Sequence, residues 1–267
     1  MRRYDRAFNR NDSRRFEDWK NDKTSKASVS ATYPHDVWDV SDEGLQDKLW
    51  NNLPDHVKPG EIILPMIDVS GSMWGQPLKV AVSLGMYLAE RNKSELKDLF
   101  LTFSENPEIL RIKGDTLRER IQNINNSEWG MNTDFEKAYR KLLEIARKHD
   151  VAKDSMPTMI LVLSDMQFDD SGNRNLHLDN IRDEYRSAGY ELPKLVFWDL
   201  EAHAGQPAEC SDENVAMISG FSPAIMKAVL NAEEFNPIDV MLEALEPIKL
   251  DYTNLKPELD IDYNREI

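Results

Sequence analysis

The stretch "IILPMIDVSGSM", residues 62–73, changes from apolar to polar within a single residue. Its apolar part does not alternate with polar residues, which is typical of a strand buried on both faces of a sheet. Asp68 stands where that strand should end, and Ser70 and Ser72 follow on alternate positions. A helix is expected directly afterwards, over residues 77–92, so the stretch predicts a strand, a polar loop and a helix in succession.

The same alternation of buried strands and amphipathic helices continues along the chain. Helices of this length between strands predict an α/β fold, with a doubly wound, mostly parallel sheet covered on both faces. The run "PEILRI" follows its neighbour after a tight turn and is expected as an antiparallel edge strand. The expected strands are 61–69, 96–104, 107–112, 157–168, 193–200 and 214–220, and the expected helices are 77–92, 115–124, 133–149, 176–189 and 222–230.

The chain has 267 residues, of which 40% are hydrophobic, and can therefore form one large domain with its own core. We predict an N-terminal arm and helical extension (1–60), an α/β domain (61–231) and an acidic C-terminal extension (232–267). Residues 1–26 carry nine Lys or Arg against five acids, whereas the C-terminal extension carries ten acids against three bases. These charges either face solvent or let the basic arm dock on an anionic surface, the chain's own acidic end included.

The composition argues against several classes of partner and compartment. A net charge of −15 disfavours broad, nonspecific binding to nucleic-acid backbones. The apolar runs are far shorter than the roughly 20 residues of a bilayer span, and no apolar stretch follows the charged N-terminus. We therefore expect neither a membrane partner nor a secretory signal. A single cysteine permits no internal disulfide and no cysteine-based metal cluster, which favours a cytoplasmic protein.

Polar side chains gather at the ends of two expected strands. Asp68 ends one strand, and Asp165 ends another, in "VLSDM". In a doubly wound sheet, sites form at the carboxyl ends of the strands. Hydroxyl and carboxylate oxygens suit Mg²⁺, Ca²⁺ or Mn²⁺ rather than zinc. The sequence therefore predicts a cation site at this edge, and an ion held mainly by neutral hydroxyls would still attract an anionic oxygen from outside.

The motif "DVSGSM", the threonine of "GMNTDF" and the aspartate of "LVLSDM" together resemble the von Willebrand factor A domain and its metal-ion-dependent adhesion site. In that family the serines and the threonine bind the ion directly, the aspartates act mostly through waters, and an acidic side chain of the partner completes an octahedron. The resemblance implies Mg²⁺, or Mn²⁺ or Ca²⁺, as the cofactor. The implied metal site consists of Asp68, Ser70, Ser72, Thr133 and Asp165.

A narrower resemblance covers most of the chain. The segments "YPHDV", "SMPTMILVLSDMQFDD", "LVFWDL" and "AMISGFS" are similar to a domain-of-unknown-function family of plants and large viruses. Its members pair a helical N-terminal region with an A domain, as the Ro-type RNA-binding proteins do. For a viral protein of this kind, the resemblance implies the host cytoplasm as the compartment.

Two tryptophans flank the proposed metal loops. Trp74 and Trp129 either pack against the domain or form a rim around the bound ligand, where aromatic side chains supply contact area for a protein or stack on bases. Asp134 is interpreted as an acid in the first turn of a helix, where the helix dipole favours it, rather than as a ligand.

The residues do not suggest an enzyme. The chain has neither the G-x-S-x-G nucleophile elbow nor a phosphate-binding loop, and no general base stands beside a nucleophile. We therefore predict a non-enzymatic, metal-dependent binding module that captures an acidic group of a partner protein. Alternatives are a single-stranded nucleic-acid-binding protein in viral transcription or replication, an adaptor for an AAA-type ATPase and, least favoured, a metal-dependent hydrolase. The sequence predicts no particular oligomeric state.

Overall fold

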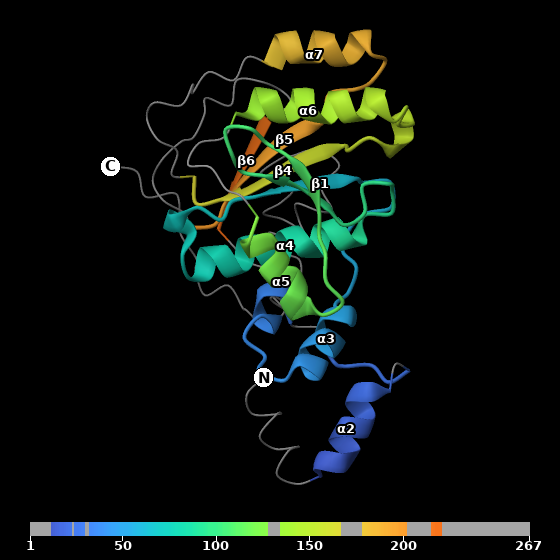
Figure 1. Cartoon of the computed structure of the whole chain (residues 1–267), viewed down its shortest axis with the longest axis vertical. Coiled ribbons are helices and arrows are strands. Elements are labelled where there is room, and N and C mark those ends of the chain that lie inside the picture. Colours follow the sequence, from blue (N-terminus) through green and yellow to red (C-terminus); the bar gives the residue numbers. More distant parts are fainter. Residues whose placement is uncertain are drawn as a thin grey trace, which may run out of the picture.

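A computed structural model describes residues 12–22, 24–29, 32–127, 134–166, 178–201 and 215–220. These residues form a six-stranded sheet between helices, with α4 and α5 on one face and α6 and α7 on the other (Figure 1). The strands are β1 (Ile63–Ile67), β2 (Leu99–Thr102), β3 (Ile109–Arg111), β4 (Met159–Ser164), β5 (Lys194–Asp199) and β6 (Val215–Ser219). The helices are α2 (Ser13–Asn21), α3 (Glu43–Asn51), α4 (Gln76–Arg91), α5 (Leu117–Asn125), α6 (Phe135–Lys148) and α7 (Leu178–Ser187), with short 3₁₀ turns η1 (Pro34–Val37), η2 (Gly71–Met73) and η3 (Lys153–Ser155).

The strand order confirms the predicted doubly wound, mostly parallel sheet. It reads β3-β2-β1-β4-β5-β6, and β1 lies inside the sheet, parallel to both β2 and β4. β3 pairs antiparallel with β2 at one edge, as the sequence predicts for "PEILRI". Pro65 lacks a backbone donor, yet it lies within β1. The β1–β2 ladder registers only Met66 and Ile67, so Pro65 occupies the part of the strand that is paired with β4 alone.

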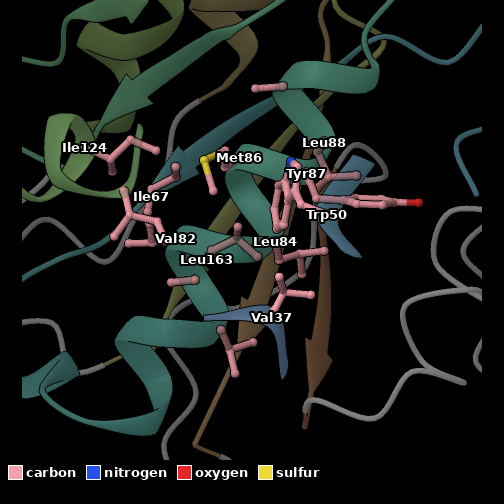
Figure 2. Close-up of a cluster of buried hydrophobic side chains, with 14 of the residues drawn as sticks. Val37, Trp50, Ile67, Val82, Leu84, Met86, Tyr87, Leu88, Ile124 and Leu163 are labelled. Atoms are coloured by element: carbon pink, nitrogen blue, oxygen red, sulfur yellow. The ribbon is translucent and has the colours of Figure 1, made fainter. Parts of the chain in front are cut away.

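Successive residues of β1 enter opposite cores, as the period of a strand requires. Ile63 and Ile67 belong to the core beneath α4, which Figure 2 shows around Ile67, Leu163 and Met86. Leu64 and Met66 belong to the core beneath α6 and α7. Both faces of β1 are therefore buried, which is why its sequence is apolar without alternation.

Helix α4 approaches the sheet closely because a glycine faces β1. A Cβ atom placed on Gly85 would lie 2.5 Å from both Cγ1 and Cδ1 of Ile67 and 3.3 Å from Cδ1 of Leu163. Ile67 is the last residue of β1 and immediately precedes Asp68. This contact therefore sets the distance between α4 and the end of the strand that carries the proposed site.

We expect the substitution Gly85→Ala to destabilise the fold by about 1–2 kcal/mol. Overpacking a filled core costs about 1–3 kcal/mol, and the better helix propensity of alanine recovers up to about 1 kcal/mol of it. Urea unfolding followed by circular dichroism would measure the change. Gly44, in α3, is a matched control, because a Cβ atom there meets nothing closer than 3.6 Å. A Gly85→Ala variant more stable than the wild type would contradict the close contact.

The described part of the predicted N-terminal extension packs on the outer side of α4. Trp50, in α3, is 1% exposed and lies against α4 beside Tyr87 and Leu88 (Figure 2). Its indole N–H donates to Oε2 of Glu90 at 2.7 Å. The backbone carbonyls of Leu53 and Pro54 accept hydrogen bonds from Arg91 and Tyr87, respectively. Helix α4 is thus covered by the sheet on one side and by α3 and the segment after it on the other.

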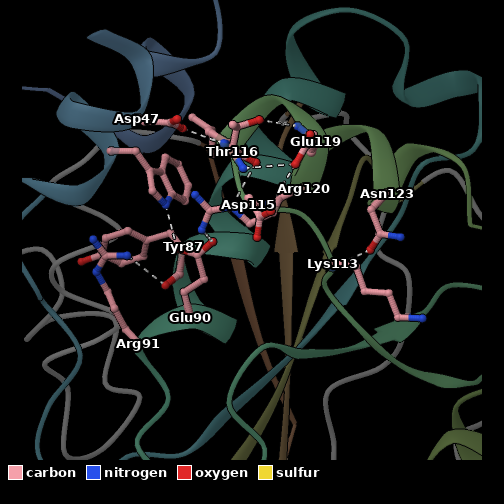
Figure 3. Close-up of polar contacts among 12 residues, drawn as sticks. Asp47, Tyr87, Glu90, Arg91, Lys113, Asp115, Thr116, Glu119, Arg120 and Asn123 are labelled. Carbon is pink, nitrogen blue, oxygen red and sulfur yellow. Dashed lines mark hydrogen bonds and ion pairs between the residues drawn. The ribbon is translucent and has the colours of Figure 1, made fainter. Parts of the chain in front are cut away.

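Polar contacts extend this packing to α5. Arg120 forms an ion pair with Glu90, and Asp47 of α3 accepts a hydrogen bond at 2.7 Å from the backbone of Leu117, the first residue of α5 (Figure 3). Thr116 caps the same helix through a reciprocal capping box with Glu119. Residues from α3, α4 and α5 therefore satisfy one another's polar groups at a single junction.

Helix α2 is attached to α3 through a buried lysine. Nζ of Lys48 donates to the carbonyl oxygens of Trp19 and Asp22 at 2.8 and 2.7 Å, where α2 ends. It also lies over the Trp19 ring at 4.7 Å from the ring centroid. Phe16 is buried in the same core as Trp50. The described residues of the basic arm therefore pack on α3.

None of the described helices combines the length and the apolar character needed to cross a bilayer. The helix expected at 222–230 and the acidic extension 232–267 lie outside the described residues. The three-part division of the chain stays a prediction.

Candidate functional site

The loop after β1 presents two hydroxyls above a buried carboxylate. Asp68 is 2% exposed, whereas Ser70 is half-buried and Ser72 is exposed. The backbone N–H of Ser70 donates to Oδ1 of Asp68 at 2.8 Å, which turns the chain sharply after the strand. The turn brings Oγ of Ser70 to 3.1 Å from Oγ of Ser72. Three of the predicted site residues therefore converge within one loop.

The end of β4 lies beside this loop, because Leu163 pairs with Ile67 in the parallel register. The backbone N–H of Asp68 donates to the carbonyl of Leu163 at 3.0 Å. Oγ of Ser164 donates to Oδ2 of Asp68 at 2.6 Å. Asp165 is 1% exposed and follows directly. The structure thus places Asp165, the fourth described residue of the predicted set, at the same edge of the sheet as Asp68.

The 3₁₀ turn η2, which lies within the loop after β1, contacts the chain after β4. Met73 is fully buried, and its Sδ accepts a hydrogen bond from the backbone N–H of Asp165 at 3.1 Å. A thioether is a weak acceptor. The contact nevertheless fixes the chain after β4 against the turn that carries Ser72, so protein contacts hold the loops at the carboxyl ends of β1 and β4 together.

The electrostatics of Asp68 favour a cation nearby. Burial raises the pKa of Asp68 above its ordinary value, and hydrogen bonds from Ser164 and Ser70 offset only part of that shift. The neighbouring carboxylate of Asp165 raises the pKa of Asp68 further. A positive charge beside the Asp68 carboxylate would stabilise its ionised form.

The donor set fits Mg²⁺. Adjacent ligands of an octahedral Mg²⁺ at about 2.1 Å lie about 3 Å apart, and the two serine Oγ atoms are separated by 3.1 Å. Each carboxylate oxygen of Asp68 already accepts a protein hydrogen bond. Asp68 is therefore better placed to hold a water of the ion than to bind the ion directly. Among the described residues, no three His, Cys, Asp or Glu side chains gather in a way that could hold a metal ion.

Thr133 and Trp129 lie outside the described residues, so their predicted roles stay predictions. Asp134, the next residue after Thr133, is the N-cap of α6, and its side chain accepts from the backbone N–H of Lys137 at 2.9 Å. Its own backbone N–H donates to the carbonyl of Ser104 at 3.4 Å, just beyond the end of β2. Helix α6 therefore begins beside the strand that neighbours β1, and Asp134 is the cap of this helix, just before the first turn in which it is expected from the sequence.

Trp74 is 85% exposed, although it is the largest side chain of the loop. It follows η2 directly, and the positive φ of Gly75 separates it from α4. Of the alternatives left open for this residue, the structure excludes packing into the core. A large exposed aromatic beside convergent hydroxyls is suited to contact a partner.

Sequence reasoning missed Ser164 and Met73. Ser164 could have been found, because it directly precedes Asp165 in the strand expected to pair with the one ending at Asp68. Met73 could not have been found, since its contact with the backbone of Asp165 depends on the conformation of the 3₁₀ turn. Serine was among the residue types considered for the cation site, whereas methionine was not.

Comparisons with known proteins give a family and two longer relatives. The model of the family described as Domain of unknown function (DUF7788) matches residues 63–254. An uncharacterized protein of Acanthamoeba polyphaga mimivirus is 31% identical over 232 residues, which are 85% of this chain and 39% of the viral protein. The crystal structure of the Deinococcus radiodurans Ro (RSR) protein is similar to 76% of this chain and 37% of that chain, with 18% identity and a TM-score of 0.48. The chain thus spans well under half the length of either protein.

Proposed function

The chain belongs to the family described as Domain of unknown function (DUF7788), and we propose that it is a non-enzymatic binding module that uses a divalent cation to capture an acidic group of a partner protein. The cation is Mg²⁺, held by Ser70, Ser72 and Thr133 and supported by Asp68 and Asp165. The site is of the metal-ion-dependent adhesion type of von Willebrand factor A domains.

One observation carries the proposal. The hydroxyls of Ser70 and Ser72 lie 3.1 Å apart on an accessible loop, directly after a buried carboxylate whose own oxygens are occupied by protein donors. An ion bound there would have mostly neutral ligands, and its positive charge would be balanced only through Asp68 and Asp165. An anionic oxygen from outside would complete both its coordination and its charge.

The exposed side chain of Trp74 supports a macromolecular partner. A single carboxylate on a cation provides little contact area, whereas a tryptophan beside it supplies a large apolar surface of the kind that dominates binding at interfaces. An acidic residue with an apolar neighbour on the partner would satisfy both features. A protein surface offers this combination.

Titration with Mg²⁺ alone tests the proposal first. We expect the wild type to bind Mg²⁺ in isothermal titration calorimetry, and the double variant Ser70→Ala, Ser72→Ala to lose at least about tenfold in affinity because direct ligands are removed. Neither side chain is buried, so the variant should unfold at nearly the same urea concentration as the wild type in EDTA. Equal Mg²⁺ affinity in the two proteins would contradict the site.

The partner class is tested with a displayed peptide library. Peptides retained by the wild type in Mg²⁺ and released by EDTA should carry an aspartate or glutamate, and replacing it by its amide should abolish retention. Gel shifts with single-stranded DNA and RNA over a salt series examine the nucleic-acid alternative. Affinity that falls steeply with salt and is indifferent to EDTA would favour nucleic acid over the proposed function.

A further inference from the structure

The hydroxyl of Ser164 has a fixed orientation. It is 1% exposed at the end of β4, it accepts the backbone N–H of Met166 at 3.1 Å, and it lies 2.6 Å from Oδ2 of Asp68. An amide N–H only donates and an ionised carboxylate only accepts. The hydroxyl proton therefore points to Asp68, and Ser164 acts as an oriented donor from the neighbouring strand.

Asp68 is consequently held at both of its oxygens by donors from different segments. The N–H of Ser70 donates to Oδ1 from the loop itself, while Ser164 donates to Oδ2 from β4. A rotation about the Cβ–Cγ bond that moved the carboxylate plane out of this orientation would weaken both hydrogen bonds. The second donor is itself fixed, because Met166 adopts a left-handed backbone conformation with φ of 57° and donates its N–H to the same hydroxyl.

Rigidity at this position matters differently for different cations. Mg²⁺ requires near-ideal octahedral geometry at about 2.0–2.1 Å, whereas Ca²⁺ accepts more ligands at about 2.3–2.6 Å in flexible arrangements. We infer that Ser164 is a positioning residue that makes the proposed site selective for Mg²⁺ over Ca²⁺, by fixing the carboxylate of Asp68 in one orientation. This inference rests on the proposed metal-binding function.

The test compares the affinities for the two cations. We expect Ser164→Ala to weaken Mg²⁺ binding by about tenfold or more, the range found when an outer group that orients the coordination of a metal is removed. Ca²⁺ binding should change by less than about threefold, since the flexible coordination of Ca²⁺ tolerates a displaced carboxylate and the water it holds. The quantity measured is the ratio of the Ca²⁺ and Mg²⁺ dissociation constants by isothermal titration calorimetry, with unfolding in EDTA as a check of the fold.

Three further variants sharpen the result. Ser164→Cys keeps the shape but donates weakly, so it should shift the ratio in the same direction even where the alanine variant folds poorly. Ser164→Thr keeps the hydroxyl and should restore most of the selectivity. Ser83→Ala removes an equally buried serine hydroxyl from α4 and should leave the ratio unchanged.

The possible outcomes distinguish a failure of the role inferred for Ser164 from a failure of the proposed metal-binding function. A wild type that binds Mg²⁺, together with a Ser164→Ala variant whose affinities for both cations fall equally or stay unchanged, would overturn the role of Ser164 and leave the proposed function standing. A wild type that binds neither cation would overturn both. A selective loss of Mg²⁺ affinity in the alanine and cysteine variants, recovered by threonine, supports the inference.

Discussion

The substitution Asp68→Ala is expected to abolish Mg²⁺ binding, with a loss in affinity of more than about a hundredfold, while the protein stays folded. The carboxylate supplies much of the negative charge that balances the ion, and it also accepts the hydrogen bond that shapes the Ser70 turn. Its removal therefore affects both the charge of the site and the position of the hydroxyls. The resulting loss should exceed that of any other single change considered for the described residues.

The free energy of unfolding in EDTA should change by only about 1 kcal/mol in this variant. Two hydrogen bonds, each contributing about 0.5–1.5 kcal/mol, are lost with Asp68. The cost of keeping a carboxylate buried, which is reflected in its raised pKa, is lost at the same time and offsets part of this effect. The alanine variant can thus separate binding from stability.

Thermal unfolding with and without Mg²⁺ measures the effect of Asp68→Ala. At a Mg²⁺ concentration of about one hundred times its dissociation constant, binding stabilises the wild type by about 2.7 kcal/mol, which raises its Tm; the variant should show no such rise. Asp42→Ala is the matched control, because Asp42 caps α3 through the backbone N–H of Leu45 and lies in the N-terminal region. That control should lose about 1 kcal/mol of stability yet keep the full response to Mg²⁺. A Tm that still rises with Mg²⁺ in Asp68→Ala would refute the site.

The substitution Trp50→Ala is expected to cost about 3–5 kcal/mol of stability, the largest loss among the changes considered. The indole is fully packed against α4, so its removal leaves a cavity, and the largely buried carboxylate of Glu90 loses a hydrogen-bond donor. Burial already raises the pKa of Glu90. The ion pair with Arg120 then remains as compensation for its charge.

Urea unfolding of three tryptophan variants measures this loss. Trp50→Phe keeps most of the ring but not the donor and should lose about 1–3 kcal/mol. Trp74→Ala removes a side chain of the same type from an exposed position and should stay within about 0.5 kcal/mol of the wild type. A Trp50→Ala variant that loses less than about 1 kcal/mol would show that the N-terminal region folds independently of the sheet.

The sequence was sufficient to predict the sheet because both faces of its central strands are buried. The unbroken apolar runs before Asp68 and Asp165 could fit only strands covered on both sides, and the strand–helix alternation then required parallel neighbours. The same reasoning placed both aspartates at one edge. Their proximity follows from the topology and needs no knowledge of side-chain packing.

The sequence could not predict which surface the N-terminal region covers. The spacing of Trp50 and its apolar neighbours indicates a buried helix face, but a helix face does not specify its partner. The partner is α4, and it is identified only by contacts between distant residues, such as the hydrogen bonds from Trp50 to Glu90 and from Tyr87 to Pro54. The sulfur contact of Met73 escaped prediction for the same reason, whereas Ser164 was overlooked although it directly precedes Asp165.

The double covering of α4 has a mechanical consequence. The helix starts two residues after Trp74 and is tied to the N-terminal region along its whole length, from the ion pair of Lys79 with Asp39 to the hydrogen bond of Arg91 with Leu53. At Gly85 the helix is in close contact with the sheet, so it has no free space on that side. A displacement of the loop at Trp74 would therefore not move α4 along its axis by itself. Because α4 is attached to the N-terminal region, α3 and α2 would move together with the loop and α4.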